Sequence, residues 1–185
     1  NNLEAGAGES SGHKILIVPN HQGKVAAYDV ERYLTEFYDN ENHQHMVSPG
    51  ALYLSFPTEW GTLYSLGELE ALSRVCRKYN IPLYMDGARL GYGLAASKDV
   101  TLKDIARLCD VFYIGGTKQG ALMGEAVVIR NEALKKDFRY MIKQRGGMFA
   151  KGRLLGIQFL ELFRDGAYFK LAEHADRLAD DIRKA

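Results

Sequence analysis

Five short apolar runs, each bounded by turn residues, constrain the fold of this chain more than any other feature. The runs are Ile15–Val18, Ala51–Phe56, Ile81–Met85, Val111–Ile114 and Ala126–Ile129. Each run is continuously apolar, which is typical of parallel strands covered on both faces. Helical patterns lie between the runs. This alternation predicts an α/β fold with a mostly parallel sheet flanked by helices.

Residues that commonly cap helices precede the predicted helices. The clearest is Ser65, because Glu68 follows it three positions later and completes the capping-box pattern before an apolar stripe. Thr101 and Asp104 repeat the pattern less strictly. The predicted helices are Val30–Tyr38 after Asp29, Leu66–Tyr79 after Ser65, Ile105–Leu108 after Thr101 and Asp104, and Glu132–Lys143 after Asn131.

Composition and charge limit the classes of partner. The 185 residues are 46% hydrophobic and 25% charged, with a net charge of +1, as in a globular domain. This charge favours neither nucleic acid nor an anionic membrane as a partner. No apolar run approaches the roughly 18 residues of a membrane span. Cys76 and Cys109 are expected to be reduced, core-facing thiols, so we expect a cytoplasmic protein.

An acid and a lysine follow two of the predicted strands. Asp86 comes directly after Ile81–Met85, and Lys118 follows Val111–Ile114 through a glycine-rich turn. Ligands of α/β sheets gather at the carboxyl ends of strands. Pyridoxal phosphate needs such a pair, a lysine amine for an imine and a carboxylate against its pyridine nitrogen, and Arg89 is placed to bind a substrate carboxylate. In the alternative, Asp86 only caps a helix and Lys118 is a solvated loop residue.

Two motifs carry a family resemblance. Tyr84–Leu90 reads Tyr-Met-Asp-Gly-Ala-Arg-Leu, and Val111–Lys118 ends in Gly-Gly-Thr-Lys. The first resembles the Asp-Gly-Ala-Arg-Leu motif of the threonine aldolase and aromatic amino acid β-eliminating lyase family, which are fold-type-I pyridoxal phosphate enzymes. The second resembles the lysine segment of that family. Glu4–Ala7 followed by Gly12–Lys14 is similar to the segment after the family's cofactor-stacking His.

The resemblance implies a role for each matching residue. Lys118 would be the Schiff-base lysine, Asp86 would pair with the pyridine nitrogen, and Arg89 would bind the substrate carboxylate. Further contacts with pyridoxal 5'-phosphate are expected from Thr117, Ala88 and Thr58. No metal ligand is expected.

The activity implied is that of a pyridoxal-phosphate-dependent carbon–carbon lyase. The expected reaction is aldol cleavage of a β-hydroxy amino acid to glycine and an aldehyde. A β-eliminating amino acid lyase of the same fold is the alternative, and a non-catalytic or inactive core fragment is a further one. The family also implies a homodimer or homotetramer, and neither nucleic acid nor membrane as a partner.

The resemblance also bears on domain organisation and on departures from the family. Residues 1–150 are expected to form part of a cofactor-binding large domain, incomplete at both ends. Residues 151–185 are expected to be helices leading toward a small C-terminal domain, and the phosphate-binding residues are expected upstream of Asn1. Where threonine aldolases carry a His near the substrate hydroxyl, this chain reads Thr58-Glu59-Trp60-Gly61. Tyr64 and Tyr92 fit either the core or a wall beside the cofactor.

Overall fold

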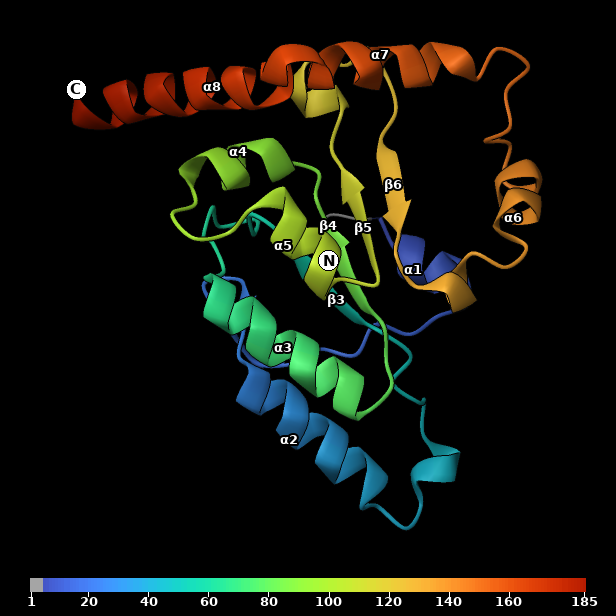
Figure 1. Ribbon diagram of the computed structural model, residues 1–185. Coiled ribbons are helices and arrows are strands. Elements are labelled where there is room, and N and C mark those ends of the chain that lie inside the picture. Colours follow the sequence, from blue (N-terminus) through green and yellow to red (C-terminus); the bar gives the residue numbers. More distant parts are fainter. Residues whose placement is uncertain (1–4) are drawn as a thin grey trace.

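The main sheet of this protein has four strands. The computed structural model describes residues 5–185, so Glu4 of the predicted His-following segment lies outside the described residues. The strands are β3 (Leu52–Ser55), β4 (Leu83–Asp86), β5 (Val111–Ile114) and β6 (Ala126–Ile129), in the spatial order β3-β4-β5-β6 (Figure 1). Pairs β3–β4 and β4–β5 are parallel, and β5–β6 is antiparallel. The predicted mostly parallel α/β sheet is confirmed.

The predicted strand Ile15–Val18 is wrong. That run has no strand conformation, and Ile17 is 81% exposed. Instead, the residues after Pro19 form a separate antiparallel ribbon of β1 (Asn20–His21) and β2 (Lys24–Val25). Gln22 and Gly23 between them both have positive φ, the geometry of a tight hairpin turn. Local pairing across this turn therefore takes the place of the expected strand.

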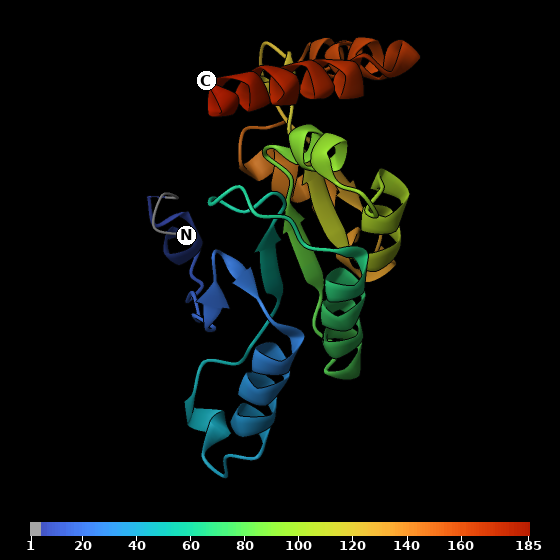
Figure 2. The same cartoon turned by 90° about the vertical axis from the view of Figure 1, so that its left-hand side faces the viewer.

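Eight α-helices occur in the described residues. They are α1 (Ala7–Ser10), α2 (Ala27–Tyr38), α3 (Leu66–Lys78), α4 (Leu90–Ala96), α5 (Leu102–Leu108), α6 (Phe138–Gln144), α7 (Arg153–Phe163) and α8 (Ala167–Lys184). Helices α3, α4 and α5 lie on one side of the sheet, while the N-terminal segment with β1 and β2 lies on the other (Figure 2). Helices α7 and α8 run across the carboxyl edge of the strands (Figure 1). None of the described helices is long and apolar enough to cross a membrane.

The capping predictions are partly confirmed. Ser65 and Thr101 both form complete capping boxes, with Glu68 and Asp104 respectively. Asp29 does not cap a helix, because α2 begins two residues earlier, after Ala26.

The predicted helix Glu132–Lys143 is broken in the structure. Asn131 caps only a short 3₁₀ helix, Glu132–Leu134, by accepting from the backbone N–H of Ala133 at 3.0 Å. Asp137 then takes a left-handed conformation, with φ of 58°, and α6 begins after it. Since L-residues avoid that conformation inside a helix, the apolar pattern is divided between two short elements.

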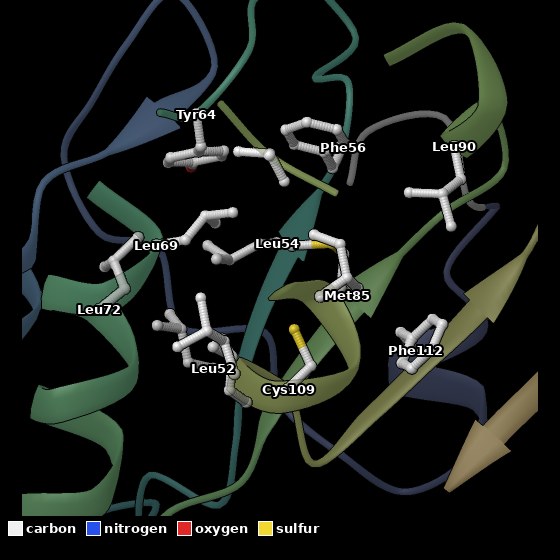
Figure 3. Close-up of a cluster of buried hydrophobic side chains, with 14 of the residues drawn as sticks. Leu52, Leu54, Phe56, Tyr64, Leu69, Leu72, Met85, Leu90, Cys109 and Phe112 are labelled. Atoms are coloured by element: carbon white, nitrogen blue, oxygen red, sulfur yellow. The ribbon is translucent and has the colours of Figure 1, made fainter. Parts of the chain in front are cut away.

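The core lies on a single face of the sheet. The core face of the strands carries Leu52, Leu54, Leu83, Met85 and Phe112, which form one buried cluster with residues of α3 and α5. Figure 3 shows part of this cluster, with Leu69 and Leu72 of α3 beside Leu52 and Leu54. The alternate residues face the other side, where Tyr53 is 40% exposed and Val127 is 51% exposed. The expectation that both faces are covered is therefore wrong for the described residues. The strand runs read as continuously apolar because tyrosine is counted as apolar, but its ring and its polar hydroxyl also suit a half-exposed surface.

Candidate functional site

The predicted acid and lysine lie at the same edge of the sheet. Asp86 is the last residue of β4, and Lys118 lies in a 3₁₀ helix, Thr117–Gln119, that follows β5. Because β4 and β5 are adjacent and parallel, both residues leave the sheet at its carboxyl edge, where α/β proteins bind ligands. The predicted placement is confirmed.

Asp86 is a buried carboxylate held by three donors. It is 8% exposed. Its Oδ1 accepts from the backbone N–H of Ala88 at 2.9 Å and from the hydroxyl of Tyr113, and its Oδ2 accepts from the hydroxyl of Tyr53. Burial, together with the hydrogen bond to Asp86, raises the pKa of Tyr113. The phenol therefore remains a donor at neutral pH.

Glycines allow the Asp86 turn and the Lys118 loop to touch. The N–H of Gly115 donates to the carbonyl of Gly87 at 2.8 Å. A Cβ on Gly87 would lie 1.9 Å from the carbonyl oxygen of Tyr113, and a Cβ on Gly115 would lie 2.2 Å from that of Ala88. Only glycine fits either position without moving the backbone, so the close contact fixes the two segments relative to each other.

Further hydrogen bonds hold the loop that carries Lys118. The exposed Lys118 accepts a hydrogen bond at its backbone carbonyl from the hydroxyl of Tyr92. The carboxylate of Glu125 accepts from the backbone N–H of Gly116 at 2.6 Å and from the hydroxyl of Thr117 at 3.0 Å. Tyr92 thus lies beside the lysine, whereas Tyr64 is a core residue, 2% exposed.

A buried glutamine links this loop to two helices. Gln119 is 3% exposed, and its Oε1 accepts from the N–H of Gly91 at 2.9 Å and from the hydroxyl of Tyr168 at 2.6 Å. The same hydroxyl lies 3.0 Å from the carbonyl of Gly115. Gly91 belongs to α4 and Tyr168 to α8. The loop that carries Lys118 is therefore locked between these helices.

Arg89, the predicted substrate-binding residue, is paired in this structure. Its guanidinium lies 3.1 Å from the carboxylate of Glu59, and the two side chains are 38% and 47% exposed. A pair this exposed contributes little to stability. A ligand carboxylate can therefore compete with Glu59 for Arg89 at small cost.

Thr58 is buried, and its hydroxyl forms hydrogen bonds within its own loop. The Thr58 Oγ1 lies 2.6 Å from the Oγ1 of Thr62 and accepts from the backbone N–H of Thr62 at 3.2 Å. The roles of Thr58, Thr117 and Ala88 toward a cofactor stay predictions. Ala88 already uses its N–H to hold Asp86, and Thr117 its hydroxyl to reach Glu125.

Sequence reasoning missed five residues that shape this site. They are Tyr53, Tyr113, Gln119, Glu125 and Tyr168. Glu125 follows the glycine-rich stretch after Lys118, which is a weak signal, and Tyr113 precedes Gly115 in the lysine motif. Tyr53 and Tyr168 lie far along the chain from their partners, and no local pattern marks them.

The chain matches a family model and several known proteins over nearly all of its length. Residues 3–185 match the family model described as β-eliminating lyase. Two low specificity L-threonine aldolases, from Pseudomonas aeruginosa and a Pseudomonas species, are 34% and 33% identical over 95% of this chain. A Leishmania major threonine aldolase structure superposes with a TM-score of 0.92 at 45% identity, over 98% of this chain and 52% of that one. The chain spans 51% of each Pseudomonas protein.

Proposed function

Because this chain belongs to the β-eliminating lyase family, we propose that the whole protein is a pyridoxal-phosphate-dependent lyase that cleaves a β-hydroxy amino acid to glycine and an aldehyde. The observation that carries the proposal is the buried Asp86 carboxylate beside the Lys118 loop at one edge of the sheet. The aldolase names of the relatives at 33–45% identity support this reaction.

The residues present fit the cofactor. A carboxylate offers about four lone-pair positions, and three donors already occupy Asp86, so one position on Oδ2 is left for a protonated ring nitrogen. Lys118 would hold the cofactor through its amine, and Thr117, Ala88 and Thr58 would add contacts. The bound cofactor supplies an electron sink for the bond that breaks at Cα of the substrate.

Asp86, Lys118 and Arg89 each have a separate role in this reaction. Asp86 keeps the proton on the ring nitrogen, since its charge and its burial strengthen that contact. Lys118 holds and releases a proton at its amine nitrogen. Arg89 releases Glu59 and binds the substrate carboxylate, and the glycine contacts keep these groups at fixed positions.

β-Elimination is the second candidate, because the matching family model is that of the β-eliminating lyases. The two reactions differ in their products. Aldol cleavage of threonine or allo-threonine releases glycine and acetaldehyde. β-Elimination from serine releases pyruvate and ammonia, and β-elimination from cysteine also releases hydrogen sulfide.

The test uses the whole protein reconstituted with pyridoxal phosphate. We expect a visible absorbance band from the lysine-bound cofactor and release of acetaldehyde from threonine, both lost in Lys118→Ala. Lys151→Ala, an exposed lysine elsewhere, is the matched control and should retain the band. Pyruvate without acetaldehyde would favour β-elimination. Absence of both the band and turnover would leave a non-catalytic protein.

Location and assembly also belong to this proposal. We propose a cytoplasmic protein, supported by two free cysteine thiols, Cys76 and Cys109, both buried. Burial raises the pKa of each thiol to about 12, so neither is a reactive thiolate.

We also propose a homodimer or homotetramer. The proposal is supported by Leu122 and Met123, which follow Lys118 by four and five residues and are 89% and 58% exposed. Light scattering of the cofactor-bound protein would measure the assembly.

A further inference from the structure

Asp86 receives a phenol from the strand on each side. It lies at the end of β4, between β3 and β5. Tyr53 of β3 donates to Oδ2, and Tyr113 of β5 donates to Oδ1. The two donors come from the strands on either side of β4, so each carboxylate oxygen accepts a hydrogen bond from one phenol.

Strand register places the three residues together. Ser55 pairs with Asp86, so Tyr53 lies two residues earlier on the same face of β3. Phe112 pairs with Met85, so Tyr113 lies opposite Asp86 on β5. Because side chains alternate between faces along a strand, all three side chains leave the same face of the sheet. The core residues Met85 and Phe112 leave the other face.

We propose that Tyr53 and Tyr113 are positioning residues that hold the Asp86 carboxylate in one orientation, with one Oδ2 lone pair available for the protonated ring nitrogen. The inference rests on the proposed function. Hydrogen bonds to a carboxylate favour its charged form, and two donors on opposite oxygens prevent rotation of the group. The protonated ring nitrogen would then meet an Oδ2 lone pair held in a fixed direction.

Tyr84 provides a matched control. It lies on the same face, its ring stacks on that of Tyr53 at 5.3 Å, and it is tilted against Tyr113 at 6.4 Å. Among the described residues, the donors to the Asp86 carboxylate are Tyr53, Ala88 and Tyr113, and the hydroxyl of Tyr84 is not one of them. Tyr84→Phe therefore removes a hydroxyl from the same environment without removing a donor to Asp86.

The first measurement needs no cofactor. In apo-protein with ¹³C-labelled tyrosine, the ζ-carbon resonances report each phenol as pH rises, and Tyr113→Phe assigns the signal of Tyr113. We expect the pKa of Tyr113 to fall in Asp86→Asn, because the charge that opposes its ionisation is gone. An unchanged titration would overturn the inference.

The second measurement uses the cofactor-loaded protein. We expect Tyr53→Phe and Tyr113→Phe each to raise the cofactor dissociation constant about tenfold. Each should also lower kcat more than it raises KM for threonine. The pH dependence of the visible band should shift in both, whereas Tyr84→Phe should keep the wild-type dissociation constant and band.

The outcomes separate the inference from the proposed function. A wild-type protein that develops no visible band would overturn the proposed function. A wild-type protein that develops the band, together with Tyr53→Phe and Tyr113→Phe proteins indistinguishable from Tyr84→Phe, would overturn only the role of the two phenols.

Discussion

Asp86 and Arg89, both at the carboxyl edge of the sheet, differ in burial, so we expect their substitutions to change different kinetic constants. Asp86 is buried and accepts three hydrogen bonds, so its charge acts in a site with little water. Arg89 is partly exposed and exchanges Glu59 for a ligand. The first residue is suited to stabilising a transition state, and the second to binding a ground state.

Asp86→Asn and Arg89→Ala are therefore expected to alter different kinetic constants. Asp86→Asn keeps the shape but removes the charge that stabilises a protonated ring nitrogen, so kcat should fall about a hundredfold or more. Arg89→Ala should raise KM about tenfold or more, since it removes a charge-assisted contact to the substrate carboxylate. Steady-state kinetics at saturating cofactor measures both. Near-normal kcat in Asp86→Asn would contradict the mechanism.

Glu59→Gln tests the competition for Arg89. The exposed Arg89–Glu59 pair is worth about 0.2–1 kcal/mol, which a substrate carboxylate has to offset. Removing the charge should lower KM, by up to about fivefold. Glu161→Gln is the control, because its carboxylate pairs with Arg164 at 2.9 Å. A higher KM in Glu59→Gln would instead mean that Glu59 helps to bind the substrate.

At the scale of elements, backbone contact between two turns decides where the site residues lie. The turn after β4 and the loop after β5 meet through Gly87 and Gly115. The glycine of α3 has no such role. Gly67 of α3 is exposed and has open space around its Cβ position.

Gly87→Ala and Gly67→Ala should change stability with opposite signs. A Cβ on Gly87 would meet backbone at 1.9 Å, so the turns must separate, and unfolding free energy should fall by about 1–3 kcal/mol or more. Gly67→Ala should raise it by about 0.5–1 kcal/mol, because alanine favours the helix. Urea denaturation measures both. Equal stability of the two variants would show that the turns accommodate a methyl group.

At the scale of the whole molecule, the C-terminal helix takes part in holding the lysine loop. Helix α8 packs against α4, and its residues Tyr168 and Ala172 are fully buried. The hydroxyl of Tyr168 reaches both Gly115 and Gln119. We propose that residues 1–150 form the cofactor-binding part and residues 151–185 the connecting helices, with Tyr168 as the link between them.

Tyr168→Phe should destabilise the protein and loosen the loop. The variant keeps the ring but removes a buried hydroxyl that lies within hydrogen-bond distance of two oxygens, those of Gln119 and Gly115, which should cost about 1–3 kcal/mol of unfolding free energy. Thermal unfolding measures the loss, and hydrogen exchange at Gly116 and Gln119 should become faster. Tyr140→Phe, at a residue 70% exposed, is the control. Equal melting temperatures for the two variants would contradict the proposed link.

The sequence by itself determined the strand runs from residue 51 onward, the capping boxes, and the placement of Asp86 and Lys118, because these depend on local patterns and on strand order. Tertiary structure alone decided that one face of the sheet, with Tyr53, is partly exposed, and it alone made the hydrogen bonds to Asp86 and Gly115. Tyr53 and Tyr168 meet their partners only after strands are registered and helices are packed. Such contacts join distant segments, so no local spacing encodes them.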